Sequence, residues 1–138
     1  MFVQRILVGY DGKEQSEHAL ELAIDLSMQY NAEIHLAFIV HEPFQMADPM
    51  SDEVNESFVK IGQKTLSNAV RTVRKRSIIP VTHLENGNPG KKLLELADKI
   101  KPDLVILGMM KHSLYEKTLG SVSSYFLNSK QYPLILVP

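Results

Sequence analysis

The stretch Asp103-Leu-Val-Ile-Leu-Gly108 leads, after a polar segment, to Gly120-Ser-Val-Ser123. An apolar run that ends on a glycine is typical of a buried parallel strand, and serines after a second glycine are typical of a helix start. A helix start presents unpaired N–H groups and the positive end of its dipole, which suit a phosphate group. Glycine lets the backbone approach phosphate oxygens closely, and serine hydroxyls donate further hydrogen bonds. A plain strand end and a plain helix cap would also produce this pattern.

The length and composition are those of an ordinary globular protein. The 138 residues suffice for a sizeable core, and we expect one domain over residues 1–138. The formal net charge of −1 gives no electrostatic reason to expect a nucleic acid or an anionic membrane as a partner. The absence of cysteine excludes disulfides and zinc–thiolate sites. No apolar run approaches the roughly 20 residues of a membrane span, so we expect a cytoplasmic protein.

Strand and helix patterns alternate along the chain. Apolar runs predict strands over residues 3–8, 34–40, 78–84, 104–107 and 134–137. Apolar residues at helical spacing predict helices over residues 13–30 and about 52–76, a third helix that starts at Pro89 and ends before Pro102, and a last helix over about 121–129. Asn88 is the expected N-cap of the third helix, and Pro89 suits its first position.

This alternation predicts an α/β fold with a five-stranded parallel sheet and helices on both faces. In such folds, ligands bind at the carboxyl ends of the strands, where the winding of the sheet reverses. The first and fourth strands are the expected neighbours at that point. Gly9-Tyr-Asp-Gly12 and Gly108-Met-Met-Lys111 should therefore meet at one site.

These landmarks resemble the universal stress protein family. The opening Arg5-Ile-Leu-Val-Gly-Tyr-Asp-Gly12 is similar to the family pattern ILVxxDGS. Further matches are Ser16, Ala19, Leu20, Glu85-Asn-Gly-Asn-Pro-Gly90, Leu94, Ala97, Asp103, Gly108, Gly120-Ser-Val-Ser123 and residues 133–137. The resemblance spans the whole chain, and it implies a Rossmann-like fold of the adenine nucleotide alpha hydrolase type with strand order 3-2-1-4-5.

For function, the resemblance implies a site for ATP with Mg²⁺ or Mn²⁺. Many members bind ATP through a strand-four glycine, two residues, a second glycine, nine residues, and then glycine and serine. Here Gly108 matches, but Lys111 occupies the second glycine position, and only eight residues separate it from Gly120. Lys111 can add positive charge at the phosphates, or it can close a cradle that glycine would leave open. The intact Gly120-Ser-Val-Ser123 favours nucleotide binding.

Carried over position by position, the resemblance places the adenosine beside Gly9 and Asp11, and the adenine against the backbone of Ile39 or, with a one-residue shift, Val40. The remaining site residues would wrap the ribose and phosphates. They are Gly108, Met109, Met110, Lys111, His112, Gly120, Ser121, Val122 and Ser123. Each residue has a structural alternative: Asp11 can cap the first helix or hold its turn, and Ile39 and Val40 can be core residues.

No pair of residues presents itself as nucleophile and base, so we expect no efficient catalysis and at most slow ATP hydrolysis. The five histidines have no metal-ligand spacing, and we expect His35 to be a structural strand residue. Two functions remain open. One is an ATP-binding stress-response or signalling module. The other is a dimeric interaction or chaperone-like module that binds no nucleotide.

The last predicted strand, Pro133-Leu-Ile-Leu-Val-Pro138, is short, apolar and expected at a sheet edge. Such an edge favours pairing with another chain, and the flanking prolines limit how far the pairing spreads. The resemblance implies the same, since many members dimerise by pairing this strand across a twofold axis. We therefore expect a homodimer through residues 133–138. The alternative is that the strand is covered by the chain's own helices.

Overall fold

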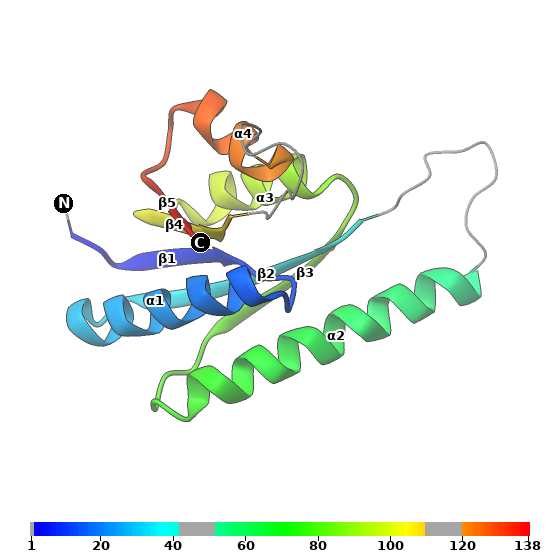
Figure 1. Ribbon diagram of the computed structural model, residues 1–138, viewed down its shortest axis with the longest axis horizontal. Helices are drawn as coiled ribbons and strands as arrows, with labels where there is room; N and C mark the ends of the chain where they lie inside the picture. Colours follow the sequence, from blue (N-terminus) through cyan, green and yellow to red (C-terminus); the bar gives the residue numbers. More distant parts are fainter. Residues whose placement is uncertain (1, 42–51, 110–119) are drawn as a thin grey trace.

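A computed structural model describes residues 2–41, 52–109 and 120–138, with the backbone alone at 52–55. Strands and helices alternate through these residues (Figure 1). The elements are β1 (Arg5–Gly9), α1 (Glu14–Tyr30), β2 (Glu33–Val40), α2 (Asp52–Arg74), β3 (Val81–Asn86), α3 (Pro89–Ile100), β4 (Leu104–Gly108), α4 (Ser121–Ser129) and β5 (Leu134–Val137). No helix in the described ranges is long and apolar enough to cross a membrane.

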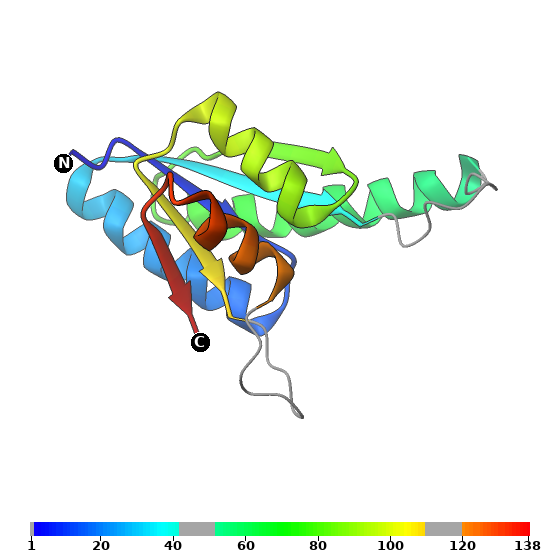
Figure 2. The same cartoon turned by 90° about the horizontal axis from the view of Figure 1, so that it is seen from above.

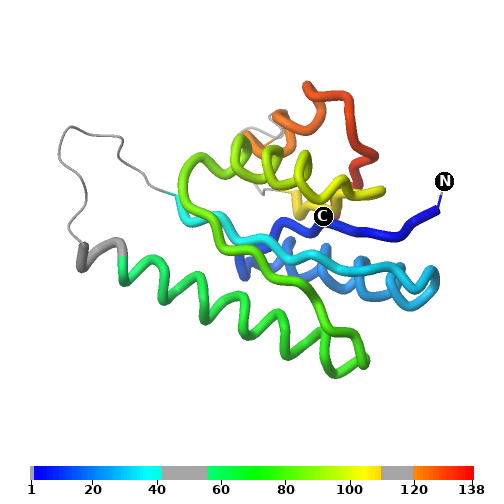
Figure 3. The backbone as a smooth tube through the Cα atoms, turned by 180° about the vertical axis from the view of Figure 1, so that it is seen from behind, coloured from blue at the N-terminus to red at the C-terminus, as the bar shows by residue number. Residues whose placement is uncertain are grey.

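The five strands form one parallel sheet in the order β3-β2-β1-β4-β5, which confirms the predicted fold class and strand order. Helices α1 and α2 cover one face of the sheet, and α3 and α4 cover the other (Figures 1 and 2). From behind, β3 lies at one edge of the sheet, with α2 below it and α3 above it (Figure 3). At the centre of the sheet, Gly9 of β1 lies opposite both Ala37 of β2 and Leu107 of β4.

Each face of the sheet carries its own apolar core, because successive side chains of a strand point to opposite faces. In β1, Ile6 and Val8 pack into the core beneath α1 and α2, while Leu7 packs into the core beneath α3 and α4. All three side chains are fully buried. A central parallel strand is buried on both faces in this way, which explains why β1 reads as a continuous apolar run.

The boundaries of β3 and α2 differ from the prediction. The strand expected over 78–84 is Val81–Asn86, and its pairing with β2 starts where Val81 lies opposite His35. Pro80, directly before it, has no N–H group to donate to a ladder, so the apolar residues ahead of it do not extend the strand. Helix α2 ends at Arg74, two residues early, because Ser77 takes a left-handed conformation (φ 61°) and donates its N–H to the carbonyl of Arg74.

Candidate functional site

The turn between β1 and α1 is built around the carboxylate of Asp11. Its Oδ1 accepts a hydrogen bond from the N–H of Lys13 at 2.9 Å, and the Ser16 hydroxyl lies 2.9 Å from the same oxygen. Lys13 is the N-cap residue of α1, and its side chain has no acceptor with which to cap the helix. These two contacts of Asp11 hold the turn ahead of α1, which realises one structural alternative for this residue, but they give no bond to the N–H groups of the first turn of α1. None of the described residues bonds to its other oxygen, Oδ2, and the residue is exposed.

Tyr10, directly before Asp11, anchors the same turn in the core. Its N–H donates to the carbonyl of Ala37 in β2 at 2.8 Å, and its hydroxyl donates to the carboxylate of Glu17 in α1. The side chain is 4% exposed. Burial, followed by the bond to Glu17, raises the pKa of the Tyr10 hydroxyl well above its usual range. The sequence analysis missed this contact, and its only sequence signal is an aromatic residue inside an otherwise polar turn.

At the end of β4, Gly108 is required by the way α1 packs. A Cβ atom at this position would lie 2.5 Å from the carbonyl carbon of Gln15 and 2.7 Å from the nitrogen of Ser16. Both are backbone atoms of the first turn of α1, so no side chain can move aside to make room. At Gly9, a Cβ atom would meet only the side-chain ends of Leu107 and Leu93, at 2.7 and 3.1 Å, and these can shift. Gly108 therefore has a strong packing reason that needs no ligand, and Gly9 has a weaker one.

The N-cap residue of α4 contributes no capping side chain. Gly120, its N-cap residue, is buried and has φ −58° and ψ 156°, a conformation open to any residue. Because glycine has no side chain, Gly120 cannot cap α4, and the first-turn N–H groups need another acceptor. Ser121 is exposed, Val122 is half-buried and Ser123 is buried. The second turn of α4 lies against the start of α3, where a Cβ on Gly90 would meet the Tyr125 ring at 2.5 Å.

At the end of β2, the structure places Ile39 and Val40 beside the turn that leads from β3 into α3. The Val40 carbonyl accepts the N–H of Gly87 at 2.9 Å, and Val40 is 4% exposed. Ile39 is half-buried and packs against the core beneath α3 and α4. A carbonyl oxygen has two lone pairs, so that of Val40 retains one acceptor position.

Most of the predicted site residues lie at one edge of the sheet. Gly9, Asp11, Ile39 and Gly108 are at or just after the carboxyl ends of β1, β2 and β4, and α4 starts on that side (Figure 2). Met109 follows β4, is 40% exposed, and donates its N–H to the carbonyl of Val137 at 2.7 Å. Met110, Lys111 and His112 lie outside the described residues.

The N-cap expected at Asn88, with Pro89 at the first helical position, is confirmed, since Asn88 Oδ1 accepts the N–H of Lys91 at 3.0 Å.

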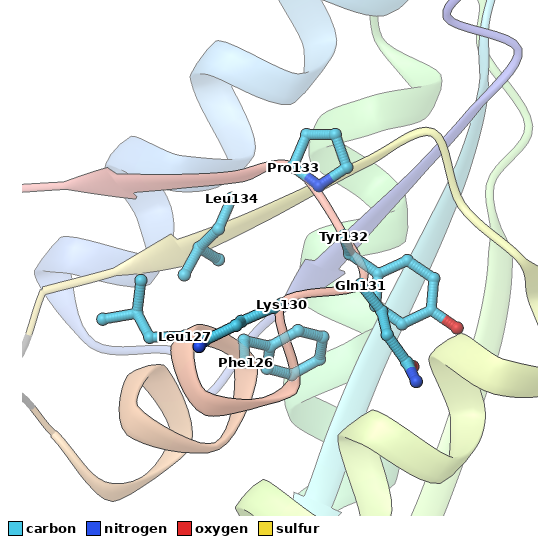
Figure 4. Close-up of a pocket in the computed structure, with 7 residues that line it drawn as sticks. All are labelled: Phe126, Leu127, Lys130, Gln131, Tyr132, Pro133 and Leu134. Carbon is cyan, nitrogen blue, oxygen red and sulfur yellow. The ribbon is translucent and has the colours of Figure 1, made fainter.

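A pocket of about 430 Å³ lies elsewhere, between the end of α4 and the start of β5 (Figure 4). It is lined by Phe126, Leu127, Lys130, Gln131, Tyr132, Pro133 and Leu134. Because β5 runs parallel to β4, its start lies at the amino edge of the sheet, opposite the predicted site. This pocket and the predicted nucleotide site are therefore separate.

The part of the chain that the structure describes contains no group of three or more His, Asp or Glu residues placed to hold a metal ion. His35 is buried in β2 and has structural partners, as expected. Its Nδ1 lies 2.8 Å from Nε2 of His83 in β3, and its Nε2 contacts the carboxylate of Glu33. Burial, and then the neighbouring His35, lower the pKa of His83.

Comparison with known proteins identifies the family of this chain. A sequence model of the universal stress protein family matches residues 3–138. The chain belongs to the universal stress protein family. A universal stress protein of Methanocaldococcus jannaschii is 25% identical, and the match covers 97% of this chain and 81% of that protein. The crystal structure of a family member from Burkholderia pseudomallei has a TM-score of 0.80 at 21% identity, covering 99% of this chain and 97% of the other.

Three other solved universal stress proteins with this fold contain adenine nucleotides. A protein from Archaeoglobus fulgidus is in complex with dAMP (TM-score 0.69, 20% identity, all of both chains covered). Another is in complex with cAMP (TM-score 0.71, 23% identity, 100% of this chain and 99% of the other). A protein from Arabidopsis thaliana has AMP bound (TM-score 0.68, 12% identity, 97% and 90%). At these identities the likeness establishes the shared fold, and the ligands belong to those proteins.

Proposed function

We propose that this universal stress protein binds an adenine nucleotide, ATP, at the carboxyl edge of its sheet. The observation that carries the proposal is the start of α4, a buried glycine N-cap followed by serines on the side of the sheet where β1 and β4 end. Uncapped N–H groups at a helix start attract a phosphate through their hydrogen bonds and through the helix dipole. The adenine nucleotides in three proteins of the same fold support the choice of ligand.

Each proposed site residue would contact a different part of the nucleotide, according to its chemistry. Asp11 is exposed and uses Oδ1 for the turn, which leaves Oδ2 to accept a hydrogen bond from a ribose hydroxyl. Ile39 or Val40 would lie against the adenine, and Gly9, Gly108 and Met109 would border the ribose. The α4 start would hold the phosphates with the backbone N–H groups and hydroxyls of Ser121 and Ser123. Lys111 and His112 are proposed phosphate neighbours from the sequence alone.

Mg²⁺ or Mn²⁺ would accompany ATP mainly as a ligand of the phosphates. The described residues offer no cluster of three metal-binding side chains, which fits a cation that keeps several water ligands and binds through phosphate oxygens. The bound cation would reduce the negative charge of the phosphates. The protein residues would bind and orient the nucleotide, and we propose no efficient hydrolysis.

Calorimetric titration of the full chain with ATP and Mg²⁺ tests this proposal, with Gly120→Asp and Gly120→Asn as a matched pair of variants. Both side chains can cap α4, but only aspartate adds a negative charge. We expect saturable binding to the wild type, and a dissociation constant about tenfold or more higher for Gly120→Asp than for Gly120→Asn because the carboxylate repels the phosphates. No heat and no thermal shift at millimolar ATP would refute the proposal.

Lys111 provides a second arm of the same titration. If its ammonium group contacts a phosphate, Lys111→Ala weakens ATP binding more than adenosine binding, by about 1–3 kcal/mol for a charge-assisted bond. If the lysine instead closes the phosphate cradle, Lys111→Gly strengthens ATP binding, because glycine restores the conformational freedom of the family pattern. Equal affinities in the wild type and both variants would show that Lys111 does not contact the ligand.

A second candidate function is a dimeric interaction module that binds no nucleotide. The observation in its favour is that Asp11 and Gly108 each have a structural reason within the protein, since Asp11 holds a turn and Gly108 is required by packing. The two functions are distinguished by the nucleotide content of freshly purified protein. Ultraviolet absorbance and chromatography of a denatured sample should reveal co-purified adenine nucleotide under the first function and none under the second.

A further inference from the structure

Tyr10 connects three parts of the fold at the point where the chain leaves the core for the proposed site. Its backbone N–H is bonded to Ala37 of β2, and its hydroxyl is bonded to Glu17 of α1. Its ring belongs to the core cluster that also contains Leu66 and Ala69 of α2. The next residue, Asp11, is exposed. The chain therefore passes from a fully anchored position to the proposed ligand contact in a single step.

The contacts of Asp11 continue this connection as far as β4. Its Oδ1 contacts the Lys13 N–H and the Ser16 hydroxyl. The backbone of Ser16 in turn packs closely against Gly108, since a Cβ atom built on Gly108 would lie only 2.7 Å from the Ser16 nitrogen. The position of Asp11 relative to the β4 end is thus set by the first turn of α1. Tyr10 contacts the same turn of α1 from the core side, because its hydroxyl is bonded to Glu17, the residue after Ser16. Gly12, at φ +82°, leaves the turn little stiffness of its own.

We infer that Tyr10 is a positioning residue of the nucleotide site, whose hydroxyl, through its bond to Glu17, holds the turn so that Asp11 Oδ2 faces the adenosine. This inference rests on the proposed function. A turn that is ordered before binding lowers the entropic cost of association. Loosening the turn therefore lowers the affinity for the nucleotide without removing any direct contact. Glu17 is only half-buried, so its carboxylate can be hydrated when the tyrosine hydroxyl is absent, and Tyr10→Phe should fold.

The chain offers a matched control in Tyr132, whose hydroxyl donates to Asp98 at 2.6 Å. Burial and this bond raise the pKa of the Tyr132 hydroxyl to about 12, so its setting resembles that of Tyr10. Tyr132 lines the pocket at the amino edge of the sheet, away from the proposed site. Tyr132→Phe therefore removes a tyrosine–carboxylate bond with no path to Asp11.

The experiment is titration of the full-length wild type and variants with ATP–Mg²⁺ and with adenosine, well below the unfolding temperature. We expect Tyr10→Phe to raise both dissociation constants by the same factor, about fivefold, because Asp11 serves the adenosine moiety shared by both ligands. Glu17→Ala should have the same effect. The double variant Tyr10→Phe/Glu17→Ala should bind the ligands no more weakly than either single variant. Glu17→Gln keeps an acceptor for the hydroxyl and should stay close to the wild type. Tyr132→Phe should change neither constant.

Amide hydrogen exchange adds a readout that needs no ligand. The N–H of Lys13, bonded to Asp11, should exchange faster in Tyr10→Phe than in the wild type, and at the wild-type rate in Tyr132→Phe. If the wild type binds ATP and Tyr10→Phe binds both ligands with unchanged constants, the inference is wrong and the proposed function stands. If the wild type binds neither ligand, the proposed function and the inference fall together.

Discussion

At the scale of single residues, His35 and His83 form a pair whose bond depends on protonation. An N···N hydrogen bond of 2.8 Å requires one nitrogen to donate and the other to accept. The pair can hold this bond when both rings are neutral or when one is charged, but two charged rings would direct N–H groups at each other. The lowered pKa of His83, caused first by burial and then by His35, reflects the cost of adding that proton.

This pair predicts a loss of stability in mild acid. A histidine whose pKa is lower in the folded state stabilises the fold fully above its unfolded pKa of 6.5, and that contribution is lost as the pH falls below this value toward the folded pKa. We expect the free energy of unfolding, measured by urea denaturation between pH 7.5 and pH 5, to fall more steeply in the wild type than in His83→Gln. His18→Gln controls for the loss of a histidine outside this pair, since His18 is exposed and its Nδ1 lies 2.8 Å from the carbonyl of Pro138. Parallel curves for the wild type and His83→Gln would contradict this interpretation.

At the scale of secondary-structure elements, the packing of α1 against the end of β4 depends on Gly108. A methyl group there would meet the backbone of Gln15 at 2.5 Å, so Gly108→Ala must displace the start of α1. We expect a loss of about 1–3 kcal/mol in the free energy of unfolding, the usual cost of overpacking. Urea denaturation measures it, with the exposed neighbour Met109→Ala as a control that should change stability by less than about 0.5 kcal/mol. An unchanged midpoint for Gly108→Ala would show that α1 tolerates the displacement.

The same scale shows what the sequence can predict. The bounds of α4 and β5 were predicted correctly, because each is a compact pattern between clear glycine or proline boundaries. The start of β3 was predicted wrongly, because the apolar residues before Pro80 resemble a strand. Only the pairing with β2, which begins at Val81, shows that they are not part of it. The strand order alone predicted that the ends of β1 and β4 lie side by side. It did not predict the contacts Tyr10–Glu17 and His35–His83, because these join residues of different elements and leave no local periodicity.

At the scale of the whole molecule, the two edges of the sheet are unlike each other. The edge strand β3 has the sequence Val-Thr-His-Leu-Glu-Asn, whereas the opposite edge strand, β5, is Leu-Ile-Leu-Val throughout. Polar and charged residues discourage pairing at an edge, and apolar ones favour it. No other described strand pairs with the outer side of β5. We therefore propose that the protein forms a homodimer through residues 133–138, with β5 of each chain pairing across a twofold axis.

The parallel pairing of β5 with β4 indicates which of its N–H groups would serve such a dimer. The carbonyls of Pro133 and Val137 accept bonds from the β4 side, from the N–H groups of Val105 and Met109. In a parallel ladder the backbone groups of alternate residues point to alternate sides, so those of Leu134 and Leu136 face the free edge. Leu136→Pro therefore removes an outward N–H group and leaves the bonds to β4 in place.

Sedimentation equilibrium should give about twice the 15.6 kDa chain mass for the wild type. We expect Leu136→Pro to sediment as a folded monomer, because the outer ladder loses a donor and the proline ring obstructs the partner strand. Leu136→Ala removes similar apolar packing but keeps the N–H group, so it should remain a dimer and control for the shortened side chain. A folded wild-type monomer at tens of micromolar would exclude the assembly. A dimeric Leu136→Pro would show that the protein dimerises through another surface.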